Sequence, residues 1–210
     1  MINKQGIETI IGTHNSMSYL PPRRWWHRLM LPFARCQNKT IDEQLAAGAR
    51  CFDLRISFDR DGMARFRHGW CRFADDETIS TVLERLQQHG GIYVRLILEE
   101  PLSLWNTLKQ ASGLKATQKP DAANEYYFPR RCALYQKTYH GITFLGGYRK
   151  YDWAKLYDFD TGPIPLHQHV SSMDPAAPWW QRLLPKLYAR KHNPANLQAS
   201  QPGINLFDYI

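Results

Sequence analysis

The stretch Glu8-Thr9-Ile10-Ile11-Gly12-Thr13-His14-Asn15-Ser16 decides how the rest of the chain is interpreted. Residues 8–11 are rich in β-forming side chains and are followed by a glycine, which predicts a short buried strand that opens into a loop. In α/β proteins the side chains at the carboxyl ends of strands do much of the chemistry. His14 is therefore a candidate catalytic residue, although a lone histidine is more often structural.

Three further polar motifs occur in or just after strand-like stretches. They are Phe52-Asp53-Leu54-Arg55, Arg67-His68-Gly69 and Phe207-Asp208-Tyr209-Ile210. Asp53 and Arg55 are two residues apart, so they share one face of their strand. A purely structural interpretation also exists, in which Asp53 and Arg55 form a buried ion pair and Asp208 belongs to a C-terminal turn.

The remaining sequence alternates short apolar strands with helices. Strands are predicted at 50–56, 63–69, 92–98, 141–145, 164–171 and 204–210, and helices at 40–47, 78–88 and 102–110. A loop is predicted over 112–129 and a surface segment over 152–160. This alternation predicts an α/β protein with a mostly parallel sheet, folded as a small, irregular TIM-like (β/α) barrel. No repeat or linker divides the chain, so residues 1–210 are expected to form a single domain.

Composition narrows the classes of partner. The chain has 210 residues and a net charge of +8, which predicts attraction to an anionic lipid, nucleic acid or phosphorylated substrate. It has no recognised nucleic-acid motif and no apolar run of membrane-spanning length. No signal peptide precedes the first strand, so we expect a cytoplasmic or peripheral membrane protein, or a secreted one if a signal was removed.

Two segments combine tryptophan with basic and apolar residues. Trp25-Trp26 follow a pair of arginines, and Trp179-Trp180 precede Arg182. Such segments either pack their rings into the core or lie at a membrane interface, where tryptophan beside basic side chains suits the headgroup layer. The first segment alone favours neither interpretation.

Taken in order, the four polar motifs resemble the catalytic X-type domain of phosphatidylinositol-specific phospholipase C. The similarity is greatest to the small, metal-independent bacterial type, and it extends along nearly the whole chain. It implies that His14 is the general base, Asp208 its orienting partner, His68 the general acid and Arg55 the cation on the phosphate. Asn15 and Asp53 complete the catalytic set that the resemblance implies.

The implied reaction accounts for these residue types. The inositol 2-hydroxyl attacks the phosphate, which gives diacylglycerol and inositol 1,2-cyclic phosphate. Two histidines can serve as base and acid near neutral pH. A carboxylate behind the base fixes its tautomer, and a guanidinium matches the geometry of phosphate oxygens.

The resemblance also implies how the substrate is held. The family uses a basic residue after a middle strand and an aromatic ring against the inositol, for which Arg149, Tyr148 and Lys150 are candidates. Trp25, Trp26, Trp179 and Trp180 fall where the family places tryptophans that enter the membrane interface. We therefore expect a monomer that binds a phosphoinositide lipid at an anionic membrane surface and binds no nucleic acid.

The cofactor prediction rests on Arg55, which replaces an acidic metal ligand of the calcium-dependent branch of the family. We expect no metal cofactor. If the enzyme is metal-dependent instead, Asn15, Asp53 and Glu99 supply the oxygen ligands that Ca²⁺ prefers. Asn15 and Glu99 are the two positions that depart from the metal-independent pattern.

Two other functions remain open. A related barrel phosphodiesterase, acting on glycerophosphodiesters or sphingomyelin, uses magnesium held by a Glu-x-Asp pair, which Asp53-Leu54-Arg55 does not supply. A non-catalytic lipid-binding module keeps a basic, tryptophan-rich rim but has no need of two histidines, an arginine and a carboxylate.

Overall fold

The computed structural model describes residues 8–100, 103, 105, 121–149, 152–157 and 164–210. Its strands are β1 (Thr9–Thr13), β2 (Cys51–Phe58), β3 (Ala64–His68), β4 (Cys71–Arg72), β5 (Ile92–Leu98), β6 (Ile142–Arg149), β7 (Asp152–Tyr157), β8 (Leu166–His169) and β9 (Gly203–Phe207). Its α-helices are α1 (Leu31–Ala34), α2 (Ile41–Ala46), α3 (Ile79–Leu86), α5 (Ala122–Thr138), α6 (Trp179–Leu183) and α7 (Pro185–Gln198). Two short 3-10 helices, η1 (Trp25–Met30) and η2 (Ser171–Met173), complete the described elements.

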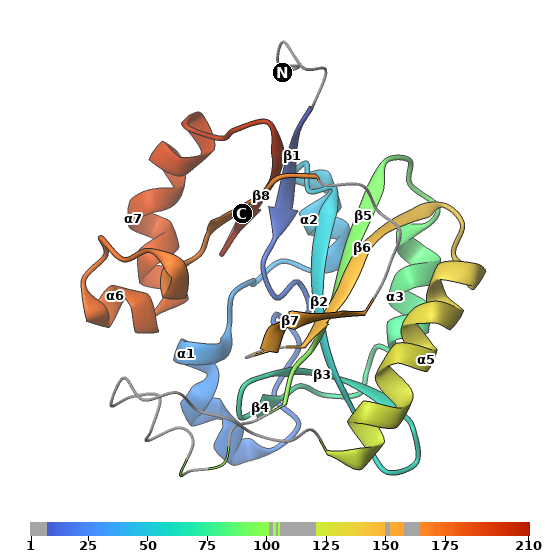
Figure 1. Ribbon diagram of the computed structural model, residues 1–210. Coiled ribbons are helices and arrows are strands. Elements are labelled where there is room, and N and C mark those ends of the chain that lie inside the picture. Colours follow the sequence, from blue (N-terminus) through green and yellow to red (C-terminus); the bar gives the residue numbers. More distant parts are fainter. Residues whose placement is uncertain (1–7, 101–102, 104, 106–120, 150–151, 158–163) are drawn as a thin grey trace.

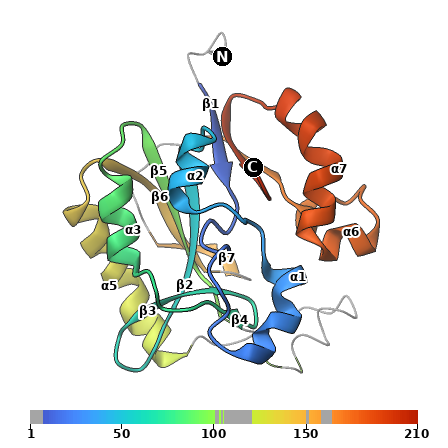
Figure 2. The same cartoon turned by 180° about the vertical axis from the view of Figure 1, so that it is seen from behind.

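The described strands belong to one sheet, in the order β7-β6-β5-β2-β1-β9-β8, with β3 attached to β2 and β4 attached to β3. The strands from β6 through β5, β2, β1 and β9 to β8 pair in parallel, whereas β3 and β7 pair antiparallel. Helices α3 and α5 lie on one side of the sheet and α6 and α7 on the opposite side of the molecule (Figures 1 and 2). The fold is the irregular, TIM-like α/β barrel that the sequence predicts, and no pairing among the described residues joins its end strands β7 and β8.

Strand β2 explains how the core and a polar interior coexist. All eight of its residues are buried. Phe52, Leu54 and Ile56 point into the apolar core beneath the helices, and the alternating positions Asp53 and Arg55 therefore face the interior of the barrel. A strand that is buried on both faces usually has a nearly continuous apolar sequence. In β2, the charged residues Asp53 and Arg55 both lie on the face that points into the barrel.

Gly12 allows the central strand β1 to lie close to both of its neighbours. A Cβ atom on Gly12 would lie 2.6 Å from Leu206 Cδ2 and 2.9 Å from Cys51 Cβ. Both distances are shorter than side chains accept. Glycine at this position therefore brings β1 against β2 and β9, two residues before His14.

The helix that precedes β2 begins as the sequence predicts. The Thr40 side chain accepts a hydrogen bond from the Glu43 backbone N–H, and the Glu43 carboxylate accepts one from the Thr40 N–H. This reciprocal capping box fixes the start of α2. The chain then turns at Gly48, where φ is +95°, and enters β2.

One sequence-based prediction is wrong in the described residues. Residues 122–129, predicted as a loop, form the first half of α5, with Asp121 as N-cap. Pro129 lies inside that helix because burial of Asn124, Phe128 and Cys132 along one stripe outweighs its missing N–H. Residues 152–157 form strand β7 against β6.

The helix predicted over 102–110 falls almost entirely outside the described residues. No helix in the described part of the chain is long and apolar enough to cross a membrane.

Candidate active site

The candidate site forms where the carboxyl ends of four neighbouring parallel strands meet. His14 follows β1, Arg55 lies in β2, Glu99 follows β5 and Asp208 follows β9. The His14 backbone N–H donates to Phe207 O at 2.9 Å, which continues the β1–β9 pairing into the site. All four side chains are buried: Glu99 and Asp208 are inaccessible, while His14 and Arg55 retain 6% and 5% exposure. The polar groups are therefore largely shielded from water.

Asp208 orients His14. The Asp208 Oδ1 atom lies 2.6 Å from His14 Nδ1, and Oδ2 accepts a hydrogen bond from the Ser171 backbone N–H at 3.0 Å. Burial acts to raise the pKa of Asp208, but the neighbouring His14 outweighs it and the pKa lies below its ordinary value. A carboxylate in this position accepts the Nδ1 proton of the histidine.

Arg55 fixes the other nitrogen of the same ring. Its Nη2 atom lies 2.6 Å from His14 Nε2. A guanidinium has only donors and keeps its protons in proteins, so Nε2 must be the acceptor. His14 thus carries its proton on Nδ1 and directs its basic lone pair into the site, as a general base requires.

Two carboxylates hold the Arg55 guanidinium. Asp53 Oδ2 accepts from Nε at 2.9 Å, and Glu99 Oε2 accepts from Nη1 at 3.0 Å. Burial acts to lower the pKa of Arg55, but Asp53 and Glu99 reverse that effect and raise it above its ordinary value. Arg55 is therefore a fixed positive charge beside the candidate base.

His68 lies next to the His14 ring. The two ring centroids are 5.9 Å apart and the ring planes are nearly perpendicular, at 88°. His68 Nδ1 lies 2.8 Å from Ala34 O, so Nδ1 must donate to that carbonyl. The two histidines are thus close enough to act on one phosphate from different directions.

Glu99 links Arg55 to the turn that carries His68. Its second oxygen, Oε1, accepts a hydrogen bond from the Gly69 backbone N–H at 2.7 Å. Gly69 has a φ of +54°, a left-handed conformation that glycine adopts without strain. One buried carboxylate therefore holds both the candidate phosphate-binding cation and the residue after the candidate acid.

Asn15 stabilises the backbone around His14 through two hydrogen bonds. Its N–H donates to Asp53 Oδ2 at 3.2 Å, and its side-chain Nδ2 donates to Ala34 O at 3.4 Å. Its φ is +46°, a conformation that asparagine tolerates better than most residues. Asn15 thus shapes the turn after β1 and ties it to Asp53.

Two of the three alternative calcium ligands are arranged around a cation of the protein itself. The carboxylates of Asp53 and Glu99 bracket the Arg55 guanidinium, and the Asn15 side chain donates to a carbonyl group. The pKa of Asp53 lies below its ordinary value because Arg55 and Arg95 together outweigh the effect of burial. The positive charge that a metal would supply between these oxygens is supplied by Arg55.

A second group of possible metal ligands consists of His14, Cys36 and Asp208, whose ligand atoms all lie within 4.8 Å of one another. His14 and Asp208 are already hydrogen-bonded to each other. Burial, followed by the negative charge of Asp208, raises the pKa of the Cys36 thiol well above its ordinary value. Because sulfur binds metals as a thiolate, this group fits a metal poorly.

Arg95 and Cys36 are parts of the site that the sequence reasoning missed. Arg95 Nη1 lies 3.8 Å from Asp53 Oδ1, and its signal in the sequence is an arginine within the apolar run 92–98. In the parallel β2–β5 pairing, Asp53 and Arg95 are register partners. Cys36 lies 3.8 Å from His68 Nδ1, and nothing in its sequence context indicates this position.

The structure describes only the backbone of two of the three residues that are predicted to bind the headgroup. Tyr148 and Arg149 end strand β6, but their side chains, and the whole of Lys150, lie outside the described residues. The four tryptophans are surface residues rather than core residues: Trp25 is 79% exposed and Trp179 73%, with Trp26 and Trp180 at 40% and 44%.

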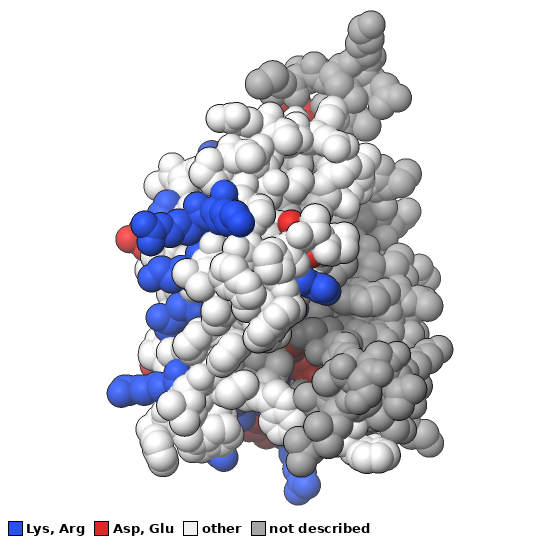
Figure 3. Space-filling view, turned by 90° about the vertical axis from the view of Figure 1, so that its left-hand side faces the viewer, with Lys and Arg blue, Asp and Glu red and all other residues white. Residues whose placement is uncertain are grey.

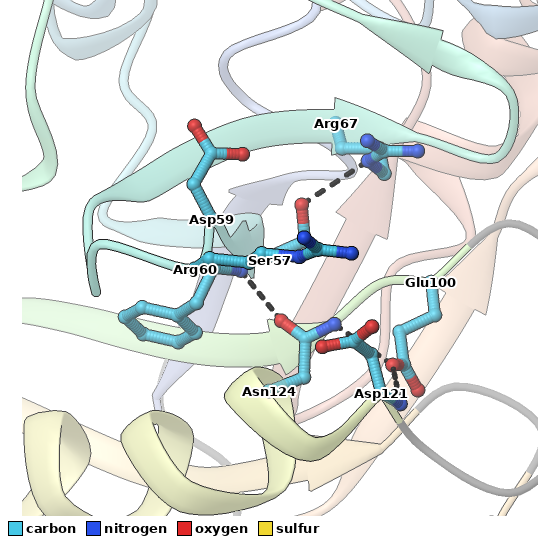
Figure 4. Close-up of a pocket in the computed structure, with 8 residues that line it drawn as sticks. Ser57, Asp59, Arg60, Arg67, Glu100, Asp121 and Asn124 are labelled. Atoms are coloured by element: carbon cyan, nitrogen blue, oxygen red, sulfur yellow. Dashed lines mark hydrogen bonds between the residues drawn. The ribbon is translucent and has the colours of Figure 1, made fainter.

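A polar cavity of about 360 Å³ lies at the carboxyl end of β2. Figure 4 shows Arg60 and Arg67 on one side of it and Glu100 and Asp121 on the other. Arg67 Nε donates to Ser57 Oγ at 3.1 Å. Burial lowers the pKa of Arg67. Arg67 directly precedes His68 and Glu100 directly follows Glu99, so this cavity lies beside the histidine and arginine cluster.

No family model matches the sequence, and no curated protein matches it. Solved structures do match the fold. The phosphatidylinositol-specific phospholipase C from Listeria monocytogenes is 15% identical, with 96% of this chain and 88% of that chain covered and a TM-score of 0.56. A double mutant of the Staphylococcus aureus phosphatidylinositol-specific phospholipase C is 13% identical, with 96% and 85% covered and a TM-score of 0.57. The chain therefore has the fold of these bacterial enzymes.

Proposed function

We propose that the protein is a phosphodiesterase that cleaves phosphatidylinositol-type lipids by general acid–base catalysis. The observation that carries the proposal is the position of His14. Its Nδ1 is held by Asp208 at 2.6 Å, its Nε2 faces the Arg55 guanidinium at 2.6 Å, and the His68 ring lies 5.9 Å away. The fold that is shared with two bacterial phosphatidylinositol-specific phospholipases C supports the same reaction class.

The first step forms a new phosphorus–oxygen bond. The substrate phosphate replaces His14 as the acceptor of the Arg55 Nη2 hydrogen bond, which frees the lone pair on His14 Nε2. This nitrogen takes the proton of the inositol 2-hydroxyl as its oxygen attacks phosphorus. Asp208 stabilises the imidazolium that results, and Arg55 stabilises the charge on the phosphate oxygens.

The same step breaks the bond to the diacylglycerol oxygen. His68, protonated on both ring nitrogens, keeps its Nδ1 proton on Ala34 O and donates its Nε2 proton to that oxygen, so the products are diacylglycerol and inositol 1,2-cyclic phosphate. The 5.9 Å between the two rings leaves room for a phosphate that both histidines contact from different sides.

We propose that this reaction needs no metal ion. Arg55 lies between Asp53 and Glu99 and supplies the positive charge that Ca²⁺ would supply between oxygen ligands. The magnesium-dependent barrel phosphodiesterases are less well supported, since Arg55 replaces an acidic ligand of their Glu-x-Asp pair.

The substrate is proposed to be a lipid within a membrane surface. The exposed rings of Trp25 and Trp179 suit the headgroup layer. One solved structure with this fold comes from work on membrane binding by the Staphylococcus aureus enzyme. Tyr148, Arg149 and Lys150 remain the candidates for headgroup recognition, and the polar cavity of Figure 4 offers further hydrogen-bond partners for a polyol.

The experiment that tests the proposal compares His14→Ala and His68→Ala with the parent protein on phosphatidylinositol vesicles. His89→Ala is a matched control, because His89 is exposed and lies after α3. We expect each active-site variant to lose at least about 100-fold in turnover, the usual contribution of a general acid or base. Near-parental turnover in either variant, with an intact fold by circular dichroism, would overturn the mechanism. Retained binding without cleavage in the parent would indicate the non-catalytic lipid-binding module.

A further inference from the structure

A groove of about 420 Å³ lies on the surface between the η1–α1 segment and the junction of α6 with α7. Its lining is of two kinds. The apolar residues include Leu31, Leu184 and Leu187, and the basic residues are Arg28, Arg35 and Lys186. None of the described residues that line it is acidic. Such a lining suits an amphipathic anion, because the cations can pair with its charged group while the apolar side chains contact its apolar part.

The three cations are available to a ligand. In the part of the chain that the structure describes, none of them forms an ion pair with a carboxylate. Arg28 and Lys186 are exposed. Arg35 is half-buried, and its hydrogen bonds go to the carbonyl oxygens of residues 18, 19 and 20. These carbonyls hold the guanidinium in place without neutralising its charge.

The groove joins two acid-free segments that account for the charge of the protein. Residues 9–41 contain five Lys and Arg residues and no Asp or Glu, and residues 175–207 contain four and none. Together they carry nine positive charges, one more than the net +8 of the whole chain. Figure 3 shows lysine and arginine side chains gathered along one edge of the face that includes α6 and α7. The positive charge is thus concentrated in the two segments that form the groove.

Exposed apolar side chains surround the same groove. Leu29 in η1 is 75% exposed and Phe33 in α1 is 47% exposed, and Leu183 in α6 is 51% exposed. Trp25 and Trp179 project from the same two segments. Large apolar side chains beside unpaired cations are typical of surfaces that enter the interface of an anionic bilayer.

We propose that this groove is a binding site for an anionic phospholipid that is not the substrate. Arg28, Arg35 and Lys186 hold the headgroup phosphate, and the leucines contact the glycerol backbone and the first acyl carbons. The site thereby fixes the protein on membranes that contain negatively charged lipid. A second copy of this chain fits less well, because a two-fold interface at this face would oppose like charges.

The groove is connected to the active-site segment. Tyr209 lines the groove and directly follows Asp208, and its backbone N–H donates to Cys36 O at 2.7 Å. Arg35 lies between Ala34, whose carbonyl holds His68, and Cys36. A lipid in the groove therefore sits against the same short segments that position both histidines.

The first test uses sedimentation with phosphatidylglycerol–phosphatidylcholine vesicles, which contain no substrate and so do not depend on the proposed reaction. The variant is Arg28→Glu with Lys186→Glu. Its matched control is Arg130→Glu with Lys137→Glu, which removes the same charge from exposed positions on α5, on the opposite side of the molecule. Neither pair touches the catalytic cluster.

We expect the groove variant to lose at least about 100-fold in partitioning. Each basic residue at an anionic surface contributes about fivefold, and each of the two substitutions reverses a charge instead of only removing it. The control should lose less than about fivefold. Equal losses in both variants would overturn the proposal, since binding would then follow net charge alone. Equally tight binding of the parent to pure phosphatidylcholine vesicles would also overturn it.

The second test separates a lipid from a free phosphate and from a protein partner. Dihexanoyl phosphatidylglycerol below its micelle concentration is titrated by NMR, beside glycerol phosphate. We expect saturable shifts at Leu31, Leu184 and Leu187 with the lipid and none with glycerol phosphate. Equal shifts with both ligands would make the site a phosphate site. Concentration-dependent dimerisation that Leu187→Glu abolishes would make the groove an interface between copies.

Discussion

Arg55 and Glu99 form a buried ion pair in which Glu99 Oε2 accepts from Arg55 Nη1 at 3.0 Å. The other oxygen of Glu99 accepts from the Gly69 N–H at 2.7 Å. The carboxylate thus fixes the spacing between the Arg55 guanidinium, which is proposed to bind the phosphate, and the His68 turn. Its role in this structure is to position two proposed catalytic groups.

Replacing Glu99 with glutamine tests this role. The amide keeps the size of the side chain but loses the charge that faces Arg55, and its NH₂ group cannot accept from Gly69. We expect turnover to fall about 10- to 100-fold, as for other residues that orient a catalytic group. Steady-state kinetics on phosphatidylinositol vesicles measure the loss. Glu84→Gln, at an exposed position on α3, is the control and should change little; parental turnover in Glu99→Gln would contradict the positioning role.

Asp208→Asn probes the tautomer of His14. An asparagine can present its NH₂ group to Nδ1, which would move the ring proton to Nε2 and remove the base. We expect turnover to fall by about 10³- to 10⁴-fold, the loss seen when the corresponding carboxylate of a serine protease triad is made an amide. Nitrogen-15 NMR of the histidine ring reports the tautomer independently. A variant with an Nε2 proton and undiminished turnover would be incompatible with His14 as the base.

The lowered pKa values of Asp53 and Asp208 predict how the stability of the protein changes at low pH. Their pKa values are lower in the folded protein than in the unfolded chain, because arginine and His14 neighbours outweigh the effect of burial. Such groups stabilise the fold at pH values above the unfolded pKa, and the contribution disappears as the pH falls through the folded pKa. We expect the free energy of unfolding to decline below about pH 4. Urea titrations between about pH 3 and about pH 7 measure it, and a stability that rises towards low pH would contradict this assignment.

Trp25 and Trp179, the two most exposed tryptophans among the described side chains, test the proposed membrane-facing surface. Trp25→Ala with Trp179→Ala removes rings that are 79% and 73% exposed, so the free energy of unfolding should change by less than about 1 kcal/mol. Binding to anionic vesicles should weaken, while cleavage of a soluble headgroup analogue should be unchanged. Leu134→Ala on α5, 47% exposed, is the control for loss of apolar surface. Equal losses on vesicles and on the soluble analogue would point to a structural role for the rings.

Local sequence patterns predicted the polar side chains at the strand ends but not all of their partners. His14 and Arg55 could be predicted because β-forming stretches and the alternation of strand faces are local properties. The Asp53–Arg95 contact depends on β2 lying beside β5 in a particular register. Cys36 meets the Asp208 region through a contact between residues far apart in the chain. Neither contact can be deduced from local patterns.

The predictions for the segment around Pro129 and for the tryptophans were limited in the same way, because they too depend on contacts between distant parts of the chain. The sequence around Pro129 favours a loop, yet α5 continues through it because Phe128 and Cys132 are buried against the sheet. Trp25 and Trp179 fit either a core or a surface position by sequence alone. Only the packing of the neighbouring elements decides that their rings are exposed.

The most direct test of the central claim is phosphorus NMR of the products formed from phosphatidylinositol vesicles in the presence of EDTA. The geometry of His14, Arg55 and His68 leads us to expect inositol 1,2-cyclic phosphate as the first product, at a rate unchanged when calcium replaces EDTA. Activity that appears only with calcium would contradict the role of Arg55 and assign Asn15, Asp53 and Glu99 to a metal site. Absence of cleavage under both conditions would contradict the proposed reaction itself.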